Sequence, residues 1–162
     1  MTTDHRSRKA FRMQLHIKSF HELTVSELYE ILRVRSAVFV VEQNCIYLDP
    51  DGIDERSLHV YLEEDGKILA YLRMFKTDSE CSTIQIGRVL TVIRGKGYGM
   101  EVLRKAMEAA EGLAEIKKLY LEAQCYAIGF YEKAGFRVVS EPFLEDGIPH
   151  VQMIKDFSQQ DS

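Results

Sequence analysis

Three glycines stand where an apolar run gives way to a helical pattern: Gly95, Gly97 and Gly99. The first N–H groups of a helix have no partner within it and carry the positive end of the helix dipole. Glycines at this point leave those groups open to a phosphate, and Arg94 and Lys96 add positive charge beside them. The turn therefore predicts a site for a phosphate or a pyrophosphate.

The spacing of these glycines fits neither of the common nucleotide-binding patterns. The phosphate loop G-x-x-x-x-G-K-[ST] is absent, and glycines spaced two and two do not form G-x-G-x-x-G. The turn also lies in the middle of the chain, after several predicted strands, and not in a first βαβ unit. A strand-to-helix turn that needs only glycine conformations is the structural alternative to an anion site.

Charge and composition exclude several classes of partner. The chain has 162 residues and a formal net charge of -4, and its basic residues form no long blocks. A nucleic acid is therefore not an expected partner. No apolar stretch approaches a membrane span or the apolar region of a signal peptide, which predicts a cytoplasmic protein with no membrane partner.

Residue types that commonly bind metals show no metal-binding spacing. Cys45, Cys81 and Cys125 are odd in number and form no C-x-x-C pair, so neither a disulfide framework nor a zinc site is predicted. The acidic segment at 49–55 lacks the glutamate that completes a calcium loop. That segment is either a solvated turn or a surface that attracts a cationic amine. No metal is expected.

A single domain is predicted over residues 13–157, with a disordered or extended lead at 1–12 and a short tail at 158–162. Helical spacing follows a capping-box pattern at 24–27 and recurs after the glycine turn and before Gly135. Alternating or β-rich runs predict strands at 14–20, 58–64, 67–77, 82–93, 116–123, 136–140 and 147–155. This order predicts an α/β (α+β mixed) fold in which helices flank a mixed sheet.

Residues 94–99 read R-G-K-G-Y-G, which is similar to the acyl-coenzyme A signature R/Q-x-x-G-x-G/A of the GNAT family of N-acetyltransferases. The phrase F-Y-E-K-A-G-F at 130–136 resembles one that the family places after the next strand and a short helix. Segments 34–59 and 145–153 resemble the ElaA-type branch of that family. The resemblance implies a mixed, mostly antiparallel sheet with helices on both faces.

The same resemblance implies that acetyl-CoA, as co-substrate, gives its acetyl group directly to a primary amine in a ternary complex. It implies that backbone N–H groups hold the pyrophosphate and that the edge of the preceding strand, at Leu90, Thr91 and Val92, pairs with the pantetheine arm. The N–H of Leu90 is the expected donor to the thioester oxygen. The residues implied in pyrophosphate binding are Arg94, Gly95, Lys96, Gly97, Tyr98, Gly99 and Met100.

Acid and base groups complete the implied chemistry. By the resemblance, Tyr131 matches the general acid of the family. A phenol with a pKa of about 10 is protonated at neutral pH and can donate its proton. The alternative is that Tyr131 is only a packed aromatic residue. An alkylammonium must lose a proton before it attacks, and the candidate bases are Glu42, His59 and His150. Their structural alternatives are a solvated helix-end charge for Glu42 and structural roles for the histidines. Many family members carry Asn where this chain has Gln124.

Two functions from different classes remain at this point. The first is an acetyl-CoA-dependent N-acetyltransferase that acts on a small-molecule or peptide amine. For this enzyme a homodimer is a possible assembly. The second is a non-catalytic acyl-CoA-binding sensor or interaction module with the same fold. Tyr131 favours the enzyme, whereas a missing base would favour the binding module.

Overall fold

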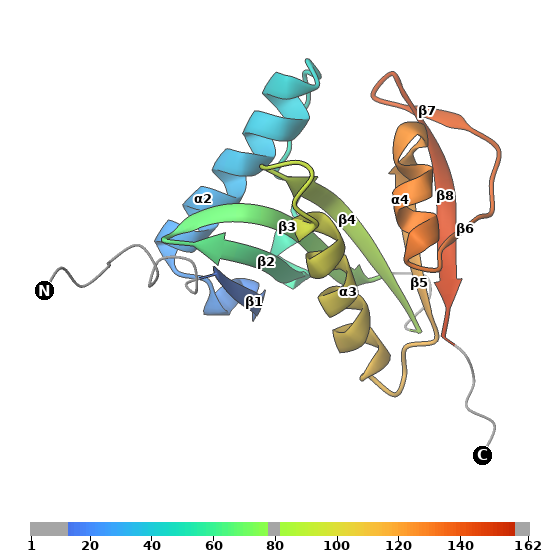
Figure 1. Ribbon diagram of the computed structural model, residues 1–162, viewed down its shortest axis with the longest axis horizontal. Coiled ribbons are helices and arrows are strands. Elements are labelled where there is room, and N and C mark those ends of the chain that lie inside the picture. Colours follow the sequence, from blue (N-terminus) through green and yellow to red (C-terminus); the bar gives the residue numbers. More distant parts are fainter. Residues whose placement is uncertain (1–12, 78–81, 158–162) are drawn as a thin grey trace, which may run out of the picture.

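The computed structural model describes residues 13–77 and 82–157, so the predicted lead, the predicted tail and Cys81 lie outside the described residues. Figure 1 shows the helices and strands in chain order. The larger helices are α2 (Val25–Arg35), α3 (Tyr98–Glu111) and α4 (Ile128–Lys133). The strands are β1 (Met13–Ser19), β2 (Leu58–Glu64), β3 (Lys67–Lys76), β4 (Thr83–Thr91), β5 (Lys118–Gln124), β6 (Arg137–Val138), β7 (Phe143–Glu145) and β8 (Ile148–Asp156).

One mixed sheet holds all of these strands. Its order is β1-β2-β3-β4-β5-β8-β6, and β7 pairs with β8 beside β6. Every pair is antiparallel except β4 with β5, which run parallel over a short stretch. The predicted mixed, mostly antiparallel sheet is confirmed.

Helices cover both faces of the sheet. Successive side chains on a strand point to opposite faces, and on β3 the side chains of Ala70 and Leu72 join the core beneath α3 and α4, whereas Tyr71 packs beneath α2. Figure 1 shows α3 and α4 in front of the sheet and α2 behind it. Among the described residues, no helix is long and apolar enough to cross a membrane.

The predicted helix start at Thr24 is confirmed. The Thr24 hydroxyl accepts a hydrogen bond from the N–H of Glu27, and the Glu27 carboxylate accepts one from the N–H of Thr24. Beyond Arg35 the regular α-helix stops, because residues Ser36–Glu42 (η2) form a wider π-helix. This segment is rich in β-branched valines, which lower the preference for a regular α-helix.

The end of the sheet differs from the prediction of one strand at 136–140. Only Arg137–Val138 pair with β8 as β6, and the chain then returns to β8 as β7. Between the two strands the Ser140 hydroxyl accepts a hydrogen bond from the N–H of Gln152 at 2.8 Å. Pro142 follows and has no N–H to give to a ladder. The observed β6 is therefore shorter than the predicted strand, and β7 is a strand that was not predicted.

Candidate active site

The two parallel strands at the centre of the sheet separate before they end. Their pairing stops at Ile86 with Leu121, although β4 runs on to Thr91 and β5 to Gln124. Figure 1 shows β4 and β5 diverging toward the end of the sheet where α3 begins. The edge of β4 beyond Ile86 therefore has no neighbouring strand on its β5 side.

A bulge at Arg88 lies directly after the last pair. Tyr71 on β3 faces Leu90, whereas Arg73 faces Gly87, so β4 carries one more residue than β3 between these pairs. Arg88 has a φ of 54°, in the left-handed region that side chains seldom adopt. Such an inserted residue bends a strand and increases its twist. The bulge accounts for the change of direction that parts β4 from β5.

A buried network of ion pairs stabilises the bulge. The Arg88 guanidinium donates to the Asp49 carboxylate at 2.8 Å and to the Asp49 carbonyl at 3.0 Å. Arg35, which is fully buried, donates to Asp49 at 2.8 Å and to Asp54 at 2.6 Å. Arg73 donates to Asp51 and to Asp54. The acidic segment predicted as a solvated turn or an amine-attracting surface is thus mainly a structural clasp for β3 and β4.

Between the diverging strands lies a cleft of about 840 Å³, which is within the range of small-molecule sites. Several regions of the chain line it. The β4 side and glycine turn contribute Leu90, Thr91, Arg94 and Gly99; the β5 and α4 side contributes Gln124, Phe130 and Tyr131; the far end holds Glu122, Glu145 and His150. Glu42 also lines it, from the end of η2.

The glycine turn forms one end of this cleft, and its glycines serve different purposes. Gly95 and Gly97 have φ values of 79° and 77°, so their backbone requires glycine. Gly97 is the N-cap of α3 and no side chain caps the helix. Glu101 is the first residue of α3 whose N–H is hydrogen-bonded within the helix, and it donates to the Gly97 carbonyl. The earlier N–H groups are those that an anion could reach.

Gly99 is needed for packing. It is buried in the first turn of α3, and a Cβ added there would lie 2.8 Å from the Cγ2 of Thr91. No real Cβ tolerates that distance without a shift of the neighbour. Gly99 therefore lets α3 lie against the end of β4, a role that differs from the predicted opening for a phosphate.

The three residues of β4 that were predicted to pair with the pantetheine arm do not all point their N–H groups to the open edge. The N–H of Val92 donates to the Leu69 carbonyl of β3 at 2.9 Å. Because N–H directions alternate along a strand, the N–H of Leu90 also points to β3 and that of Thr91 points to the open edge. This geometry disfavours the oxygen-binding role predicted for the Leu90 N–H and favours Thr91 as an edge donor.

Tyr131 lies on α4 with its side chain facing the cleft. Its ring packs edge-on against Phe130 and Phe136, with centroids 5.1 Å and 6.0 Å away. Burial, and then the nearby Tyr126, raises the pKa of Tyr131 above its ordinary value. The phenol therefore keeps its proton at neutral pH. Within the described part of the chain, the Tyr131 hydroxyl has no hydrogen-bond partner, so its proton is available to a molecule in the cleft.

The three candidate bases lie in three different environments. Glu42 accepts a hydrogen bond from Arg94 at 2.5 Å, and both side chains are at least half exposed. His59 is fully buried and does not line the cleft; its Nδ1 is 2.7 Å from the Tyr71 hydroxyl and its Nε2 is 2.9 Å from the Asp54 carbonyl. His150 lines the cleft. Of the two histidines, the structure brings only His150 into the same cavity as Tyr131.

Sequence reasoning missed two carboxyl groups beside His150. Glu122 on β5 and Glu145 on β7 both line the cleft, and burial and then the charge of Glu122 raise the pKa of Glu145. A signal for one of them exists: Asp146 and Gly147 form the tight turn between β7 and β8. Such a D-G hairpin pairs Glu145 with Ile148, and the period of two then places His150 on the face of Glu145.

Gln124 stands where many relatives of the proposed family carry Asn. Its side chain lines the cleft and donates a hydrogen bond to the Gln43 side chain at 3.3 Å. This contact joins the end of β5 to the end of η2 across the cleft.

Comparison with known proteins agrees with this architecture. Residues 38–157 match the acetyltransferase (GNAT) domain. Protein ElaA of Escherichia coli is 39% identical over 142 residues, which are 85% of this chain and 93% of ElaA. A UPF0039 protein of Schizosaccharomyces pombe is 40% identical over 140 residues, 84% of this chain and 92% of that protein.

Solved structures give the same result. The crystal structure of E. coli ElaA has a TM-score of 0.82 at 37% identity and covers 88% of this chain and 99% of its own. An acyl-CoA N-acyltransferase from Pseudomonas aeruginosa has a TM-score of 0.81 at 38% identity, with the same coverage of 88% and 99%. The diverging strands, the glycine turn and these similarities together show that the chain belongs to the GNAT family of acetyltransferases and is ElaA-like.

Proposed function

We propose that this protein is an N-acetyltransferase that moves an acetyl group from acetyl-CoA directly to a primary amine. One observation carries the proposal: the glycine turn, the open edge of β4 and the Tyr131 hydroxyl all border a single cleft. An anion site, a strand edge for an amide-rich arm and a proton donor are what a thioester of this kind requires.

The residues of the turn suit the pyrophosphate. N–H groups without a partner in the helix at the start of α3, together with the side chains of Arg94 and Lys96, supply hydrogen bonds and positive charge. The pantetheine arm is extended and contains amides, so it can add to the open edge of β4 as a further strand would. The N–H of Thr91 is the donor that this edge supplies.

Tyr131 is the proposed general acid. The thioester supplies the acetyl group; the amine nitrogen bonds to its carbonyl carbon while the carbon–sulfur bond breaks, and the acylated nitrogen releases one proton to water. The Tyr131 hydroxyl protonates the departing thiolate and regains a proton from water. A raised pKa suits this role, because the phenol is protonated when the thiolate leaves.

The rival function is a non-catalytic acyl-CoA-binding module, and Tyr131→Phe separates the two. We expect isothermal titration calorimetry to show acetyl-CoA binding by this variant within about threefold of wild type. We expect thiol release in the presence of amines to fall by about 100-fold. Tyr29→Phe, at an exposed position on α2, is the matched control.

Each result has a clear meaning. Binding without turnover in the wild-type protein, across alkylamines and lysine-containing peptides, would support the binding module. Full turnover in Tyr131→Phe would remove the phenol from the mechanism. Absence of acetyl-CoA binding in the wild type would contradict both functions. The proposed acceptor is a small-molecule or peptide amine, and a homodimer remains a prediction that sedimentation velocity can test.

A further inference from the structure

The end of the cleft away from the glycine turn brings together three acid–base side chains, and the role inferred for them rests on the function proposed above. Three strands bring their side chains together there: Glu122 from β5, Glu145 from β7 and His150 from β8. The register of β8 with both neighbours sets this meeting, because His150 pairs with Gln124 on one side and with Phe143 on the other.

The His150 ring is held in one orientation. Its Nδ1 is 2.7 Å from the Ile148 carbonyl, and the Phe143 ring stacks on it at 6.1 Å with 26° between the planes. A carbonyl oxygen can only accept, so Nδ1 carries a proton. In the neutral ring Nε2 is then the atom with a free lone pair. The side chain is only 10% exposed, and Nε2 lies 3.6 Å from a Glu145 oxygen.

Glu145 lies beside Glu122 at this end of the cleft. Burial, and then the charge of Glu122, raises the pKa of Glu145, and Asp146 acts in the same direction while His150 opposes it. The Tyr120 hydroxyl donates to the other carboxyl, that of Glu122, at 3.0 Å.

Glu145 connects this end of the cleft to solvent. The Glu145 side chain is 48% exposed, whereas His150 is almost enclosed. A proton that reaches Nε2 therefore has one neighbouring acidic group, and that group touches solvent. This arrangement differs from that of Glu42, whose charge is paired with Arg94, and of His59, whose two ring nitrogens are bonded outside the cleft.

We propose that Nε2 of His150 accepts the proton of the acceptor ammonium and that the Glu122–Glu145 pair relays it to water. The ammonium N–H bond breaks and an Nε2–H bond forms, which leaves the nitrogen lone pair free to attack the thioester. The imidazolium then gives this proton to the Glu145 carboxylate, which releases it to solvent. His150 is the base in contact with the amine, and the two glutamates are positioning and relay residues.

The kinetic test uses two acceptors that differ in their need for a base. n-Butylamine is a small analogue of a lysine side chain and is almost wholly protonated at neutral pH, whereas hydroxylamine is largely unprotonated. We expect His150→Gln to lower kcat by about 100-fold with n-butylamine but by less than about fivefold with hydroxylamine. Glu145→Gln should lower kcat with n-butylamine by about 10-fold and spare hydroxylamine.

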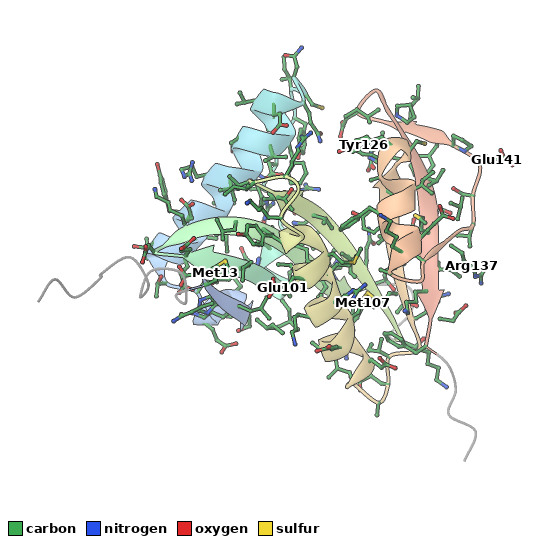
Figure 2. The ribbon with its side chains drawn as sticks, viewed as in Figure 1. Met13, Glu101, Met107, Tyr126, Arg137 and Glu141 are labelled. Atoms are coloured by element: carbon green, nitrogen blue, oxygen red, sulfur yellow. The ribbon has the colours of Figure 1, made fainter. Side chains whose placement is uncertain are left out.

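Matched controls keep the comparison specific. His21→Gln and Glu141→Gln change the same residue types at exposed positions outside the cleft lining, and both should act as wild type. Figure 2 shows Glu141 at the outer side of the β7–β8 layer, remote from α3. Acetyl-CoA binding, measured by calorimetry, should be unchanged in all four variants.

A second measurement needs no turnover. Long-range ¹H–¹⁵N spectra of histidine-labelled protein, assigned with His150→Gln, should show neutral His150 with its proton on Nδ1. A proton on Nε2 would overturn the relay, as would equal losses with both acceptors. A wild-type protein that binds acetyl-CoA but transfers acetyl to neither acceptor would contradict the proposed function itself, whereas an active His150→Gln would contradict the relay alone.

Discussion

Arg88 donates two hydrogen bonds to Asp49, one to its carboxylate at 2.8 Å and one to its carbonyl at 3.0 Å, although 39 residues separate them in the chain. Arg88 is the residue in the left-handed conformation at the β4 bulge. The pair therefore fastens the loop before β2 to the point where β4 turns away from β5. The geometry of the cleft depends on a contact that lies outside it.

Replacing Arg88 with Met should remove the contact with Asp49 and destabilise the protein. The Asp49 carboxylate, almost wholly buried, would lose one of its two arginine partners, and we expect the free energy of unfolding in urea to fall by about 2 kcal/mol. Arg137→Met is the matched control, because its pair with Asp156 is exposed on both sides and should change stability by less than about 0.5 kcal/mol. Equal effects of the two substitutions would contradict the structural role of Arg88. Figure 2 shows Arg137 on the side of β8 that faces away from α3.

Gly99→Ala should destabilise the contact between α3 and β4. The new Cβ would lie 2.8 Å from the Thr91 Cγ2, and such overpacking costs about 1–3 kcal/mol. Thr91→Ser removes that methyl group, so the double variant should recover most of the loss in thermal unfolding. Gly129→Ala, where a Cβ would meet open space, should be neutral or slightly stabilising. A Gly99→Ala protein as stable as wild type would contradict the close approach.

His59 should make the protein less stable in mild acid. Burial lowers the pKa of His59, although the hydrogen bond to the Asp54 carbonyl opposes this. The unfolded chain then binds its proton more readily, near pH 6.5. The stabilisation is complete above about pH 6.5 and is lost as the pH falls toward the lower folded pKa. Urea unfolding between pH 7.5 and 5 should show a steeper loss in wild type than in His59→Gln, with His21→Gln matching wild type.

Asp51 should contribute to stability in a more acidic range. Burial acts to raise its pKa, but hydrogen bonds from Arg73 and from the Ile53 N–H outweigh it and hold the pKa at about 2. The unfolded value is about 3.9, so this contribution is full above about pH 4 and disappears as the pH falls toward 2. Asp51→Asn should unfold more readily at pH 5, and the difference from wild type should shrink toward pH 2. A difference that is constant across this range would exclude titration of Asp51 as the cause.

Local structure was largely predictable from residue types. The capping box at Thr24 predicts the start of α2, the D-G step at Asp65 predicts the hairpin between β2 and β3, and Gly135 predicts the end of α4; all three are observed. These signals work because each depends on contacts within a few residues. The same holds for the turn at Gly97, whose backbone conformation excludes most other residues.

The site itself was predictable only in part. The sequence, by its resemblance to a family, placed the glycine turn and Tyr131 together, and both border one cleft. It could not separate His59 from His150, since each is a single histidine in a β-rich run. Tertiary structure separates them: His59 bonds to groups brought by β3 and the Asp54 turn, whereas His150 faces a cavity that exists because β4 and β5 part.

What the sequence alone determined was therefore the set of elements, the family and the place of the glycine turn. Only the tertiary structure decided which polar groups share the cleft. Glu122 and Glu145 lie 23 positions apart and meet through β8, and the Arg88 bulge depends on Asp49 in a distant loop. The physical reason is that hydrogen bonds and ion pairs of this kind act over a few ångströms in space, and sequence patterns record neighbours along the chain.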